Sequence, residues 1–159
     1  MNEKVIKSLE TAVRLEESGI YFFSNAARKF YRISELKNSM ETFAKSKVFN
    51  RNFFNDLLNQ EKKLGLKVND SGFESVDLSK FGVILEDISV VGENSMPVDV
   101  LNSAFNYILE SARFFSSMKK ALGYSVQFDK IINENKVIFE LIKKHIHNYT
   151  VEVYFYGYE

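Results

Sequence analysis

Glu16, Lys47 and Asn50 are polar residues at positions where helical periodicity predicts a buried core. Apolar residues recur in alternating steps of four and three, the spacing of the inward seam of a helix in a bundle. The first seam is Val5, Leu9, Ala12, Glu16, Gly19, Phe23, Ala26 and Phe30, and the second is Leu36, Met40, Phe43, Lys47, Asn50, Phe54, Leu57, Glu61 and Leu64. We therefore expect a carboxylate, an amine and an amide to meet at mid-bundle, the layer where helical bundles build metal and cofactor sites.

Three interpretations of Glu16 and Lys47 follow from this spacing. A buried carboxylate is costly alone, so pairing with Lys47 in a structural ion pair, completed by Asn50 and Asn135, is the first. The second is acid–base chemistry by the same carboxylate and amine. The third is a shifted register that sends Glu16 to solvent. Neither a phosphate-binding loop nor a Ser-His-Asp pattern accompanies the pair, which favours the structural interpretation.

Four helices are predicted to position these residues. Their expected ranges are 3–30, 34–64, 95–122 and 126–148, so two helix pairs (1–64 and 97–148) flank a connection at 65–96 within one domain of 159 residues. Leu78, Phe81, Leu85 and Ile88 allow a short helix in the connection, although an extended segment is equally consistent with the sequence. Alternating residues in the tail, 149–159, predict a short extended strand.

The two helix pairs form a weak internal repeat. A shift of 92 residues lays Leu9 on Leu101 and Phe23 on Phe115, and a shift of 88 lays Phe43 on Ile131. A duplicated helix pair with a long crossover connection predicts an all-α, ferritin-like four-helix bundle.

The stretches AVRLEESGIYFFSNAARKF (12–30) and METFAKSKVFNRNFFNDLL (40–58) resemble the first two helices of the rubrerythrin-like branch of the ferritin-like superfamily. Residues 101–122 and 128–145 resemble its third and fourth helices. The resemblance implies six metal-ligand positions, one Glu and one Glu-x-x-His from each helix pair. In this sequence those positions hold Glu16, Lys47, Asn50, Ile108, Asn135 and Ile138.

One of the six family ligands is retained, and no Glu-x-x-His occurs anywhere in the chain. Lysine is cationic and isoleucine has no donor atom, whereas such iron sites need several carboxylates and imidazoles. The two histidines, His145 and His147, are two residues apart and face different ways on a helix. We therefore predict no cofactor and no dinuclear metal site. The alternative is an oxidoreductase with a rearranged iron or manganese site that uses Glu16, Glu17, Glu110 or Glu134.

Composition narrows the remaining classes of function. The chain has no cysteine, which excludes thiolate metal centres and disulfides. Its 21 basic and 21 acidic side chains balance, which disfavours nucleic-acid binding. No window approaches the roughly 20 apolar residues that span a bilayer, so we expect no membrane association and a cytoplasmic location.

Doubled aromatics suggest association. Two consecutive residues of a helix cannot both enter one seam, so the pairs at 22–23, 53–54 and 114–115 predict either a widened core or an outward apolar patch that a homodimer would cover. The strand-like tail could add to the sheet of a protein partner. Together these features predict a metal-free, non-catalytic structural or protein-interaction module.

Overall fold

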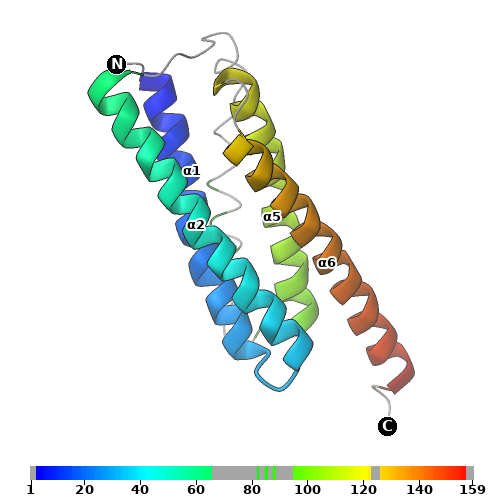
Figure 1. Ribbon diagram of the computed structural model, residues 1–159. Helices are drawn as coiled ribbons and strands as arrows, with labels where there is room; N and C mark the ends of the chain where they lie inside the picture. The colour runs from blue at the N-terminus through cyan, green and yellow to red at the C-terminus, as the bar shows by residue number, and fades with distance from the viewer. Residues whose placement is uncertain are drawn as a thin grey trace.

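The part of the chain that the computed structural model describes contains four long helices, which confirms the predicted helical fold for these residues (Figure 1). They are α1 (Glu3–Lys29), α2 (Ser34–Leu64), α5 (Pro97–Leu122) and α6 (Val126–Tyr156). The structure describes residues 3–65, 82, 85, 88, 95–122 and 126–156, and these residues contain no strand. None of the helices in these ranges has an apolar stretch long enough to cross a membrane.

Local chemistry sets the helix ends near the predicted positions. Pro97 occupies the first position of α5, where a missing backbone N–H costs nothing. Gly65 follows α2 with a positive φ of 73° and donates its N–H to the Glu61 carbonyl at 3.2 Å. That conformation favours glycine and ends the helix at Leu64.

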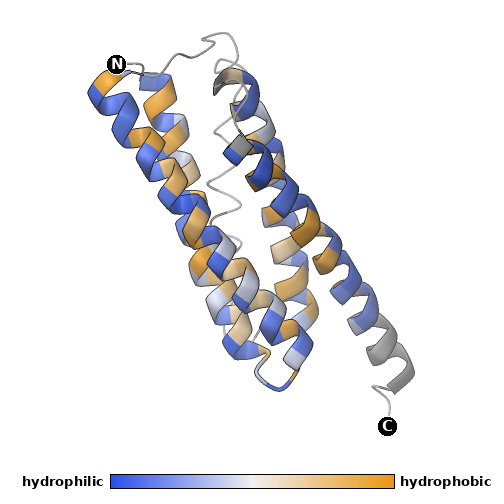
Figure 2. Cartoon of the chain, in the orientation of Figure 1, coloured by the Kyte–Doolittle hydropathy of each residue, from blue (hydrophilic) through white to orange (hydrophobic). Residues whose placement is uncertain are grey.

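The helices pack as two antiparallel pairs, α1 with α2 and α5 with α6 (Figure 1). The pairs meet where α1 contacts α5 and where α2 contacts α6. α2 ends at the opposite end of the bundle from the start of α5, so these two helices run in the same direction. Hydrophobic and hydrophilic residues alternate along every helix instead of gathering in separate segments (Figure 2), as expected for helices with one buried face.

The doubled aromatics widen the core, and the outward aromatic patch suggested by the sequence is not present. Phe22, Phe23, Phe54, Phe114 and Phe115 are all buried. The remaining ring, that of Phe53, is partly buried and packs on Phe128 with ring centroids 6.0 Å apart. Edge-to-face contacts such as these let both members of a pair find aromatic neighbours inside one bundle.

The predicted extended tail is wrong, because α6 continues to Tyr156. The alternation of Val, Glu and Tyr residues favours a strand, but no Gly or Pro interrupts the chain between 126 and 156 to stop the helix. The alternation therefore gives no evidence for strand addition to a partner.

The predicted connection lies mostly outside the described residues. Gly82, Leu85 and Ile88 have helical backbone conformation, which agrees with the short-helix interpretation at these three positions. Leu78 and Phe81 lie outside the described part. Ile88 is buried and belongs to the hydrophobic core, so the segment between the helix pairs contributes to the interior.

Candidate functional site

Four polar side chains form a layer in the middle of the bundle, and each has 0% exposure: Glu16, Lys47, Asn50 and Asn135. The Lys47 ammonium donates a hydrogen bond to Asn135 Oδ1 at 2.8 Å and lies 3.4 Å from Glu16 Oε2. Asn50 Nδ2 donates to the same Glu16 oxygen at 3.0 Å. The structure therefore brings together all four residues of the predicted polar core, and the interpretation in which Glu16 reaches solvent does not fit its burial.

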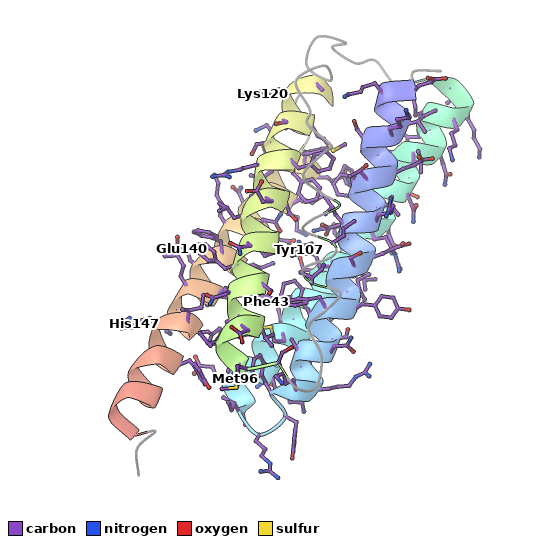
Figure 3. All side chains as sticks on the ribbon, turned by 180° about the vertical axis from the view of Figure 1, so that it is seen from behind. Phe43, Met96, Tyr107, Lys120, Glu140 and His147 are labelled. Carbon is purple, nitrogen blue, oxygen red and sulfur yellow. The ribbon has the colours of Figure 1, made fainter. Side chains whose placement is uncertain are left out.

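The ring of Tyr107, a residue that the sequence did not single out, packs against this layer. The Lys47 Nζ lies 5.8 Å from the centre of the Tyr107 ring, within range of a cation–π contact. The Tyr107 hydroxyl donates to the Leu15 carbonyl at 2.5 Å. Tyr107 lies between the two helix pairs in Figure 3, whereas Glu140 and His147 lie on the outer side.

Gly19 makes room for Tyr107. A Cβ atom built on Gly19 would collide with the Tyr107 hydroxyl oxygen and would lie 3.2 Å from Lys47 Cγ. The glycine thus lets the tyrosine ring and the lysine stem reach the α1 backbone. The sequence shows that position 19 of the first seam is a glycine. The structure shows why: the Tyr107 hydroxyl occupies the space that a larger side chain would need.

Burial dominates the electrostatics of the layer. Desolvation raises the pKa of the Glu16 carboxyl, and the Lys47 charge and the Asn50 hydrogen bond oppose that rise. Desolvation and the Glu16 charge raise the pKa of Tyr107 well above its usual range, so this phenol stays protonated. Glu16 is consequently a carboxyl group that can take up a proton more readily than one in water.

Three polar atoms of the layer have no hydrogen-bond partner among the described residues. They are Glu16 Oε1, Asn50 Oδ1 and the Asn135 Nδ2 amide nitrogen. The Lys47 ammonium is thus held through one oxygen of Glu16 and the oxygen of Asn135, while the amide nitrogen of Asn135 has no such anchor. Buried polar groups without partners are uncommon, and they concentrate at sites with chemical or conformational roles.

Ile108 and Ile138, the other two positions at which the resemblance implied metal ligands, are buried apolar residues of the core. Among the rearranged-site candidates, Glu17 is exposed and Glu110 pairs with Arg113 at 2.8 Å. Glu134 accepts a hydrogen bond from Ser46 at 3.1 Å. The described residues contain no group of three or more His, Cys, Asp or Glu side chains placed to hold a metal ion. The Glu134 charge contributes to the raised pKa of Glu16, but no metal-binding group of three such side chains forms around Glu16 among the described residues.

Residues related by the internal repeat meet at the centre of the bundle. Tyr107 bonds to Leu15, which is 92 residues earlier, and Asn135 bonds to Lys47, which is 88 residues earlier. These separations equal the two shifts that align the helix pairs. Such contacts arise when two similar halves are related by an approximate two-fold axis, because equivalent residues near the axis face one another.

The surface beside the polar layer contains a groove between α2 and α6 with a volume of about 850 Å³. Phe43, Ser46, Glu134, Val137 and Leu141 are among its lining residues. Ser46 and Glu134 directly precede Lys47 and Asn135 in sequence, so the groove adjoins the layer.

His145 occupies a second buried polar position, also between α2 and α6. Its Nε2 lies 3.0 Å from the Ser39 hydroxyl, and desolvation lowers its pKa. The charge of Glu35 opposes this effect and that of Lys144 reinforces it. His147 is exposed, so the two histidines do face different ways, as helical geometry requires.

No protein-family model, curated protein sequence or solved structure matches this chain.

Proposed function

We propose that this protein is a metal-free, non-catalytic structural or protein-interaction module with a ferritin-like bundle of the rubrerythrin-like type. The observation that carries the proposal is the Lys47 ammonium, buried between Glu16 and Asn135. In this arrangement a side-chain cation balances the buried carboxylate, a task that a metal ion performs in carboxylate-bridged bundles.

Two further observations support the ferritin-like part of the proposal. α2 and α5 run in the same direction while each helix packs against an antiparallel neighbour, an arrangement that needs one long crossover. The contacts between residues 88 and 92 apart fit a duplicated helix pair. The residues at the former ligand positions do not fit a dinuclear site, because a lysine and two isoleucines replace carboxylate and imidazole donors.

Metal analysis tests the proposal against the oxidoreductase alternative. The purified protein is incubated with Fe²⁺, Mn²⁺ or Zn²⁺, desalted, and analysed for bound metal beside the Glu16→Gln variant. We expect the same substoichiometric metal content in both proteins. Near-stoichiometric metal that survives chelation in the wild type and is lost in Glu16→Gln would overturn the proposal and favour an iron or manganese oxidoreductase.

The proposed module also forms a homodimer through the α2–α6 face. Val137 and Leu141 line the groove and expose 59% and 36% of their surface. Phe49 exposes 49%, and its ring centre lies 4.9 Å from the Nζ of Lys130, another lining residue. A two-fold contact on this face would therefore bury several apolar side chains. The test is light scattering of the 18.4 kDa chain at tens of micromolar. Val137→Glu is expected to shift the mass to that of a monomer, whereas Leu64→Glu, at an exposed residue near the end of α2, leaves it unchanged. A wild-type monomer, or no difference between the variants, contradicts this assembly.

A further inference from the structure

The polar layer places three reactive groups of complementary chemistry in one buried site. Lys47 supplies a primary amine, Asn135 a carboxamide and Glu16 a carboxyl group, and all three residues have 0% exposure. The Lys47 Nζ lies 2.8 Å from Asn135 Oδ1 and 3.4 Å from Glu16 Oε2. Because a C=O bond is about 1.2 Å long, the Asn135 carboxamide carbon lies within about 4 Å of the amine.

We propose that Lys47 and Asn135 join in an intramolecular isopeptide bond, with Glu16 as the acid–base group that moves the protons. The cross-link would tie α2 to α6, and hence the first helix pair to the second. This inference rests on the same Lys47–Glu16 pair as the proposed function, which describes the chain before the bond forms; after the reaction Lys47 carries no charge and Glu16 is protonated. The mass measurement below and the metal analysis above test the two separately.

The reaction needs no co-reactant. Lys47 first transfers a proton to Glu16, which leaves a neutral amine and a neutral carboxylic acid. The amine lone pair then forms a bond to Asn135 Cγ, while the Glu16 acid protonates the carbonyl oxygen. Nδ2 is not hydrogen-bonded to Glu16 before the reaction, so the tetrahedral carbon must turn it toward the carboxylate. Glu16 then moves one proton from the attacking nitrogen to Nδ2, the Cγ–Nδ2 bond breaks, and the carbonyl re-forms as its hydroxyl proton passes to Glu16. The products are a secondary amide, one molecule of ammonia and protonated Glu16, so atoms and charge balance.

The surroundings favour this reaction over competing reactions. Full burial keeps water from the carboxamide, so hydrolysis does not compete, and it holds the amine near the carbon without loss of entropy at the moment of attack. Burial also raises the pKa of Glu16, which favours the neutral acid that the first step creates. The Asn135 Nδ2 has no hydrogen-bond partner among the described residues, so departure of the leaving group breaks no such contact. The adjoining α2–α6 groove offers ammonia a short path to solvent.

Mass spectrometry of the purified full chain tests the proposal. Under denaturing conditions, we expect the intact mass to be lower than the sequence mass by one ammonia molecule. After trypsin digestion, the peptide that contains Lys47 is expected to be joined to the peptide that contains Asn135. Trypsin is also expected to leave the bond after Lys47 uncut, because the modified side chain carries no charge.

Variants separate this reaction from other losses of ammonia. Lys47→Arg and Glu16→Gln are expected to keep the full sequence mass, because one removes the nucleophile and the other the proton carrier. Asn135→Asp is expected to lose one water molecule instead of ammonia. Lys45→Arg and Asn133→Asp, at exposed positions on the same two helices, are the matched controls and are expected to cross-link as the wild type does.

The wild-type chain alone can overturn the proposal. A folded protein, verified by far-UV circular dichroism, that keeps its sequence mass after prolonged incubation at neutral pH contradicts it. Ammonia loss that persists in Lys47→Arg, or that joins no peptides, also contradicts it, because a succinimide or a terminal modification would then be responsible.

Discussion

Replacing Gly19 with alanine is expected to destabilise this protein, although the same change inside a helix usually stabilises. Alanine in a helix interior ordinarily gains roughly 0.5–1 kcal/mol over glycine. At Gly19 the new methyl group would collide with the Tyr107 hydroxyl and press on Lys47 Cγ at 3.2 Å. Neither side chain has space to retreat, because both are fully buried in contact with the polar layer.

The two opposing effects give the expected magnitude. Overpacking a filled core costs about 1–3 kcal/mol. Displacement of Tyr107 also weakens its hydrogen bond to the Leu15 carbonyl, and such a bond contributes about 1 kcal/mol. After the gain in helix propensity is subtracted, Gly19→Ala is expected to lower the free energy of unfolding by about 1–3 kcal/mol. For a chain of this length that corresponds to a fall in Tm of about 2–12 °C.

Urea unfolding followed by circular dichroism measures this effect, and Gly82→Ala is the matched control. Gly82 also has helical backbone, but a Cβ there meets no atom within 4 Å, so its replacement is expected to be neutral or stabilising. In Gly19→Ala with Tyr107→Phe, the colliding oxygen is absent, and the loss is expected to be smaller than the sum of the single losses. Equal stabilisation by the two Gly→Ala changes, or strict additivity of Gly19→Ala and Tyr107→Phe, would refute the packing argument.

Two predictions concern the buried charges. In the chain before any cross-link forms, Lys47→Met is expected to destabilise by about 3–5 kcal/mol while Glu16 stays charged, and by less as the pH falls, because burial raises the pKa of Glu16 and favours its protonation in the folded state. Adding Glu16→Leu should recover part of that loss at pH 7, so equal denaturation midpoints for the single and double variants would contradict the paired core. Burial lowers the pKa of His145, so its contribution to stability is present above its unfolded pKa of about 6.5 and is lost as the pH falls. His145→Gln is expected to flatten the decline in stability between pH 7 and pH 5, whereas His147→Gln is not, and identical pH profiles would contradict the assignment.

The sequence predicts the helices and their inward-facing residues better than it predicts which residues of other helices those side chains contact. The seam spacing locates Glu16, Lys47 and Asn50 because helical periodicity is a local property, and all three are buried. The helix at 34–64 is also predicted at its observed bounds, since Gly65 provides a local stop signal.

Other features depend on which helices meet, which no local pattern encodes. Tyr107 contacts Lys47 only because α5 lies opposite α1 and α2, and its importance could have been found from the repeat, which aligns it with Leu15. The aromatic pairs fill one core because rings from several helices pack against one another. The geometry of one helix considered alone therefore predicts more outward-facing rings than the structure has. In the tail, the alternating residues favour a strand, but the helix continues from 148 to 156 because no Gly or Pro ends it.

If the halves are related by an approximate two-fold axis, as the contacts between residues 88 and 92 apart suggest, that relation also accounts for their difference at the centre. Near such an axis each residue faces its own counterpart, so identical halves would place two lysines or two carboxylates together. A central metal ion makes opposed carboxylates favourable, but without that charge they repel in a low-dielectric interior. Here Lys47 faces Asn135, and the counterpart of Glu16 is Ile108. One cation and one carboxylate then remain before any cross-link forms, and each has the other as its opposite charge. The difference between the two halves at these positions is what allows a buried ion pair in this bundle.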